Sequence, residues 1–184
     1  MNSRRVLLMG ATAAVFVSSG VLAGCSSPSM EVDEAVKKID TALDDTFAAV
    51  RPPLKWSDGP AGMSQHRDLL NREDGEITVA RNRYVRTKVS KPKIGVLAKV
   101  VEKNWKAKGY ELEYQNRKVP SFSYGTPDGV SVKFDVRGEI IIISAAIADT
   151  KYPGHSGDID DGDYPNGFDL DDTVPNVTDP YWSK

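Results

Sequence analysis

The chain is poor in the side chains that build covalent links or soft-metal sites. Its 184 residues include one cysteine and two histidines. A single cysteine excludes an intrachain disulfide and a cysteine-based zinc cluster, so the folded part must be stabilised by packing. An excess of basic side chains is also absent, because the formal net charge is −2. This balance argues against nucleic acid as a partner, since phosphate backbones are bound by clustered lysine and arginine.

Long apolar runs are missing except near the beginning of the chain. After Arg4 and Arg5, residues 6–23 carry no charge and end in small side chains, which is typical of a secretory signal peptide. The run is shorter than the about 20 apolar residues of a transmembrane helix, and glycine and serine interrupt it. The arginine pair fits both a twin-arginine signal and a general secretion signal, so the export route stays open.

The segment closes with Leu22-Ala23-Gly24-Cys25, which matches the lipobox of bacterial lipoproteins. A thiolate is the nucleophile that can accept a diacylglyceryl group as a thioether. The small residues before it let a peptidase approach the backbone. We therefore expect cleavage between Gly24 and Cys25 and lipidation of Cys25. Two acyl chains would then hold the mature chain on the extracytoplasmic face of the cell membrane.

The composition predicts four parts along the chain. These are a signal peptide (1–24), a lipidated tether (25–30), a globular domain (31–148) and an acidic tail (149–184). The tail is rich in aspartate, proline and glycine and has few aliphatic side chains. Such a segment buries too little surface to offset its ordering entropy, so we expect it to be largely disordered.

Two segments have the apolar periodicity of amphipathic helices. Residues 31–50 follow Ser29 as a candidate N-cap, and residues 91–108 follow Ser90. Between the helices, residues 54–76 are polar and rich in turn formers, which predicts a loop that Trp56 pins to the core.

Strands are predicted where β-formers alternate with polar residues. They cover residues 77–89, 110–115, 121–124, 130–136 and 139–148. Helices grouped against an antiparallel sheet predict an α+β fold of two layers, with a sheet of about four strands packed against two helices.

Part of this region resembles a group of small exported lipoproteins of actinobacteria, of the Streptomyces type. The resemblance rests on the helix end Trp105-Lys106-Ala107-Lys108-Gly109-Tyr110 and on the turn Thr126-Pro127-Asp128-Gly129, which leads into the strand 130–136. It implies an actinobacterial origin and supports the fold. It carries over no functional residues, because those proteins have no assigned activity. Members often end the sheet with a further cysteine, where this chain has Ala145 and Ala146.

Few side chains suggest catalysis. Neither His66 nor His155 lies in a nucleophile motif such as Gly-x-Ser-x-Gly. Met63 and His66 together are too few ligands for a copper site. The sequence therefore predicts no catalytic residue, no metal and no cofactor.

The remaining motifs are weak. Residues 158–163 cluster aspartates, but Gly162 stands fifth where a calcium loop needs it sixth, so at most weak calcium binding is expected. Residues 59–62 are too short to cradle phosphate. Trp56, Trp105 and Tyr110 could form an aromatic platform for sugars. The helical spacing of Trp105 favours a place in the core instead.

These observations favour a membrane-anchored envelope lipoprotein that acts as a non-enzymatic binding or interaction module. Its partner would be another envelope protein or a cell-wall polymer. Two alternatives stay open: a structural or accessory lipoprotein without a ligand, and weak calcium binding through the tail.

Overall fold

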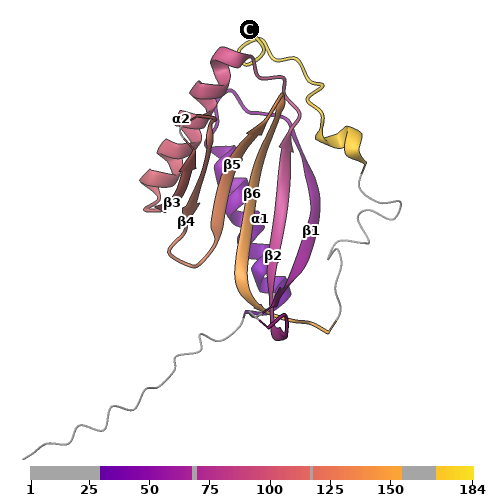
Figure 1. The fold of residues 1–184 in the computed structure, drawn as a ribbon. Coiled ribbons are helices and arrows are strands. Elements are labelled where there is room, and N and C mark those ends of the chain that lie inside the picture. Colours follow the sequence, from indigo (N-terminus) through magenta and orange to yellow (C-terminus); the bar gives the residue numbers. More distant parts are fainter. Residues whose placement is uncertain (1–29, 68–69, 117, 155–168) are drawn as a thin grey trace, which may run out of the picture.

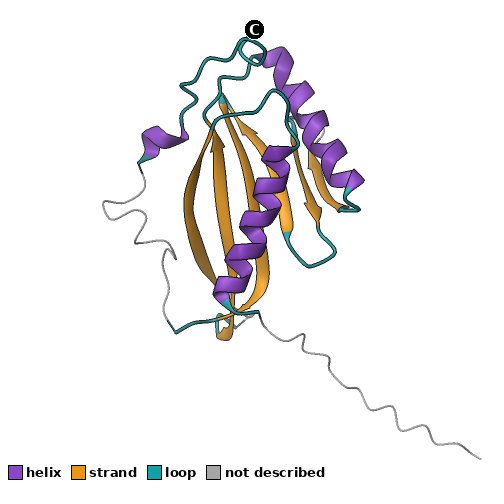
Figure 2. Ribbon diagram, turned by 180° about the vertical axis from the view of Figure 1, so that it is seen from behind, coloured by secondary structure: helices purple, strands orange, loops and turns teal. Residues whose placement is uncertain are grey.

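The structure is a computed structural model that describes residues 30–67, 70–116, 118–154 and 169–184. It is an α+β fold of two layers, in which one antiparallel six-stranded sheet packs against two helices (Figures 1 and 2). The elements are α1 (Val32–Ala48), β1 (Trp56–Arg67), β2 (Glu73–Val85), α2 (Lys91–Ala107), β3 (Glu111–Asn116), β4 (Ser121–Gly125), β5 (Ser131–Arg137), β6 (Ile140–Lys151) and the short 3-10 helix η1 (Leu170–Thr173). The sheet order is β1-β2-β6-β5-β4-β3.

Both helices lie on the same face of the sheet, as Figure 2 shows. α1 buries Ile39 and Leu43 against the sheet, and α2 buries Leu97 and Trp105. Each helix has 17 residues. In the ranges that the structure describes, neither is long and apolar enough to cross a membrane. The two predicted helices are thus confirmed, but the first is capped at Glu31. Ser29, the predicted cap, lies outside the described residues.

The prediction of about four strands was too low, and the prediction of a loop over residues 54–76 was wrong. Strand β1 occupies most of that segment and forms one edge of the sheet. Its glycines and Pro60 are unusual in a strand and therefore favoured a loop prediction. Proline has no backbone N–H to donate to a neighbouring strand, so it is tolerated only in edge strands or at bulges. Pro60 lies in such an irregularity, where the register against β2 shifts between Asp58 and Ala61. Trp56 packs against the core as predicted.

The tail over residues 149–184 was predicted to be largely disordered, but the structure describes ordered segments at both of its ends. β6 extends to Lys151, beyond the predicted boundary at 148. Residues 169–184 pack back onto the domain, where the side chain of Trp182 is fully buried and its indole N–H donates to the carbonyl of Pro52 at 2.8 Å. The backbone N–H of Lys88 also donates to the carbonyl of Val177 at 2.7 Å. The composition of the tail did not predict this packing, because composition describes the segment without the domain surface that buries Trp182. Residues 155–168 lie outside the described residues.

The two ends of the described chain lie at opposite ends of the sheet. Met30 accepts a backbone hydrogen bond from Lys151, at the end of β6. The C-terminal residue Lys184 accepts a bond from the Ser90 hydroxyl, beside the start of α2 (Figure 1). Met30, which was assigned to the tether, therefore belongs to the folded domain.

Candidate functional site

One face of the sheet carries neither α1 nor α2 (Figure 1). The short helix η1 reaches this face at one end, where the Ser57 hydroxyl donates to the Asp172 carbonyl. Side chains alternate along a strand, so β2 sends Ile77 and Val79 into the core and Thr78, Ala80 and other small or polar residues to this uncovered face. An uncovered antiparallel face that is polar is normally solvated.

An open hollow of about 390 Å³ lies on this face over β1 and β2. Its polar side chains come from Ser64, Thr78, Asn82 and Tyr84, and none of its lining residues is charged. Hydroxyl and amide groups both donate and accept hydrogen bonds, and the phenol adds a flat apolar ring. The hollow can therefore bind a neutral, polar molecule with a flat apolar face.

Gly59 makes the close approach between β1 and β2 possible at the hollow. A Cβ at this position would lie 3.2 Å from Cε2 of Tyr84 and 3.3 Å from the carbonyl oxygen of Asn82. Such contacts are tight, and one of them is to backbone. The glycines that predicted a loop thus shape the surface of an edge strand.

A second hollow, of about 340 Å³, lies between α1 and the turn that connects β4 and β5, and it is strongly charged. Lys37, Asp45 and Asp128 line it together with Tyr110. Burial raises the pKa of the Tyr110 phenol. A hydrogen bond to Asp45, 2.5 Å long, raises the pKa of Lys108. Glu34 pairs with Lys38 and Asp45 pairs with Lys108, so part of the charge at this hollow is already engaged.

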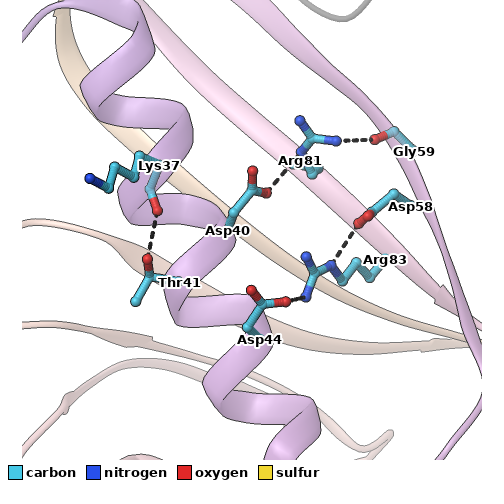
Figure 3. Close-up of polar contacts among 8 residues, drawn as sticks. All are labelled: Lys37, Asp40, Thr41, Asp44, Asp58, Gly59, Arg81 and Arg83. Atoms are coloured by element: carbon cyan, nitrogen blue, oxygen red, sulfur yellow. Dashed lines mark hydrogen bonds and ion pairs between the residues drawn. The ribbon is translucent and has the colours of Figure 1, made fainter. Parts of the chain in front are cut away.

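Beneath the hairpin of β1 and β2, two buried arginines face α1 (Figure 3). The Arg83 guanidinium bonds to Asp44 of α1 and to Asp58 of β1, both at 2.6 Å. Nε of Arg81 lies 3.1 Å from a carboxylate oxygen of Asp40. Buried ion pairs add little net stability but require one arrangement of their partners. This network therefore fixes the hairpin against α1.

The sequence held an indication of the network that was overlooked. Arg81 and Arg83 occupy the inward positions of β2, in step with Ile77 and Val79. Their partners on α1, Asp40 and Asp44, are four residues apart and therefore share one face of the helix. The Arg83 guanidinium also lies 4.1 Å from the centre of the Trp56 ring, a cation–π contact that explains why this tryptophan is held in place.

The aromatic platform considered above does not form. Trp105 is fully buried, with its ring 5.5 Å from that of Phe122, and its indole N–H donates to Thr46. Trp56 packs beneath the hairpin, and Tyr110 lines the charged hollow. The ring that faces the neutral hollow is that of Tyr84.

His66 lies on the uncovered face, but not with Met63. Met63 packs against the core, whereas the His66 ring bonds to Thr78 at 2.7 Å through Nε2. His66, Glu76 and Asp149 each offer one possible ligand atom, and these three atoms lie within 4.8 Å of one another. The predicted lipidation site, Gly24 and Cys25, and the aspartates of 158–163 lie outside the described residues.

Comparisons with protein-family models, with curated proteins and with solved structures find no match to this chain.

Proposed function

We propose that this chain is a lipid-anchored, non-enzymatic binding module of the bacterial cell envelope, and that it holds a cell-wall glycan against the uncovered face of its sheet. The observation that carries the proposal is the neutral, hydrogen-bonding hollow over β1 and β2.

The chemistry of the hollow favours a glycan over a protein partner. Sugar rings present hydroxyl and acetamido groups around an apolar face. The polar groups of a sugar can hydrogen-bond to the hydroxyls of Ser64 and Thr78 and to the amide of Asn82. The apolar face of a sugar can pack on the Tyr84 ring. Charged peptides would find no opposite charge among the lining residues. A glycan strand is also long and repetitive, which suits an open hollow on an uncovered sheet face.

The same lining supports a binding role over catalysis. General acid–base catalysis needs a side chain whose pKa lies near the working pH, most often histidine or a carboxylate. Among the residues that line the hollow there is no histidine and no carboxylate, and Tyr84 is the one with a titratable side chain.

The expected anchor would orient this surface usefully. Met30 lies five positions after Cys25, and an extended chain spans at most about 3.6 Å per residue, or about 18 Å in all. Lipidation of Cys25 would therefore hold the Met30 end of the sheet close to the membrane. The C-terminal end, marked in Figure 1, would then point toward the cell wall.

Two measurements test the anchor. Intact mass spectrometry of the protein from membranes should show that the leader is absent and that Cys25 carries a diacylglyceryl group. Cys25→Ser should leave the membrane fraction. An unmodified Cys25 on the exported protein would disprove the anchoring.

Co-sedimentation of the detergent-purified protein with insoluble peptidoglycan tests the glycan. Tyr84→Ala and Asn82→Ala should each weaken binding by about tenfold, since each removes a contact worth about 1.4 kcal/mol. Ser123→Ala is the matched control, because it lies on β4 away from the hollow. Equal binding by all three variants would refute the proposal, and so would a protein that binds no peptidoglycan.

A further inference from the structure

We infer that His66, Glu76 and Asp149 form a binding site for a divalent first-row metal ion such as Zn²⁺ on the uncovered face of the sheet. The inference concerns the cluster alone. It holds whether or not the neighbouring hollow binds a glycan.

The three residues come from three neighbouring strands. His66 lies near the end of β1, Glu76 near the start of β2, and Asp149 near the end of β6. The ladders between these strands bring them together, because β2 pairs with both of the others. One imidazole nitrogen and two carboxylate oxygens, one from each residue, then lie within 4.8 Å of one another. A single ion placed among them could contact all three after small side-chain rotations.

A β-bulge gives Asp149 its position. β2 and β6 lose register between Ile77 and Val79, so that Thr150 pairs with Ile77 while Ile147 pairs with Val79. Strict alternation from Ile147 would turn Asp149 toward the helices. The extra residue instead leaves Thr150 fully buried and places the Asp149 carboxylate beside His66. Bulges recur next to functional sites because they redirect a side chain.

The backbone at the bulge is itself unusual. Asp149 has a φ of 56°, in the left-handed region that side-chain-bearing residues seldom adopt. Asparagine and aspartate tolerate this region better than other such residues. Holding an aspartate there costs conformational energy, which a gain in ligand binding can offset.

The donor set indicates the class of ion. Imidazole favours zinc and its neighbours in the first transition row, and carboxylates are accepted by the same ions. Three protein ligands would leave at least one coordination position open for water or for a ligand oxygen. The hydrogen bond between His66 and Thr78 would supply the kind of support that orients a metal-binding imidazole, provided that the metal binds at the other ring nitrogen.

Isothermal titration of the full chain with Zn²⁺ at neutral pH tests the site. We expect one tight equivalent that weakens at least about tenfold in Glu76→Gln and in Asp149→Asn. Asparagine keeps the tolerance for a positive φ, so Asp149→Asn should fold. Asp135→Asn is the control, because it removes one carboxylate from the same face, on β5.

Proton NMR supplies a second measurement, since the chain has two histidines. One histidine ring signal, absent in His66→Gln, should lose intensity in proportion to added Zn²⁺ and be replaced by a shifted signal, with the change complete at one equivalent. A shift of the His155 signal instead, or unchanged affinity in Glu76→Gln and Asp149→Asn, would overturn the site. An equal loss in Asp135→Asn would show that the ion responds only to net charge and would overturn it as well.

Discussion

The indole of Trp182 provides the most direct test of how the C-terminal segment is held. This side chain is fully buried and its N–H donates to the Pro52 carbonyl at 2.8 Å. Replacing a buried tryptophan by alanine costs about 3–5 kcal/mol through lost packing and the cavity left behind. The orphaned carbonyl adds up to about 1 kcal/mol. We therefore expect Trp182→Ala to lower the free energy of unfolding by about 4 kcal/mol, a large share of the about 5–15 kcal/mol typical of a domain.

Urea denaturation followed by circular dichroism measures this loss. With a slope of about 2 kcal/mol per molar urea, the midpoint should fall by about 2 M. In thermal melts, the same loss should lower Tm by about 10–15 °C.

Leu170→Ala is the control within the same segment, because Leu170 is 76% exposed. It should change the unfolding free energy by less than about 0.5 kcal/mol. If Trp182→Ala and Leu170→Ala unfold at the same urea concentration, residues 169–184 do not pack as described and the buried tryptophan is not a structural contact.

Two further predictions concern the charged groups. The Arg83 side chain is 4% exposed, whereas those of Asp44 and Asp58 are 65% and 30% exposed. The double variant Asp44→Asn/Asp58→Asn leaves a buried cation without its partners, so urea melts should show a loss of about 3–5 kcal/mol in unfolding free energy. Arg83→Met leaves carboxylates that water can reach and should cost about 1 kcal/mol or less, so equal losses would contradict this asymmetry. Burial opposes ionisation of Asp135, but hydrogen bonds, including one from Ser121, keep its pKa below the ordinary value. The stability that this lowered pKa contributes is present above about pH 4 and is lost as the pH falls through the folded-state pKa. Acid titration should therefore destabilise the wild type more steeply than Asp135→Asn, and parallel curves would disprove the contribution.

Much of the architecture could be predicted because it depends on local periodicity. The apolar face of residues 91–108 identified α2, and Gly109 ends that helix with a φ of 76°, in the left-handed conformation expected of a terminating glycine. The Thr126–Gly129 turn also forms as predicted, with the Gly129 N–H donating to Thr126. These features involve residues close in sequence, so a linear pattern contains the information.

The missed features involve residues that are far apart. β1 has poor strand composition and exists because β2 supplies its ladder. The hollow depends on Gly59 meeting Tyr84, 25 positions later in the chain. His66 looked like an isolated surface histidine, because its neighbours Glu76 and Asp149 arrive from other strands.

The sequence by itself predicted the two helices, the segments that became β2 to β6, although it set the sheet at about four strands, and a lipidated Cys25, because each follows from a short run of residues with a known physical preference. Only the tertiary structure decided the edge strand, the folded C-terminal segment and the groups that share the uncovered face. Strand order, register and one bulge set those contacts, and no local pattern in the chain encodes them.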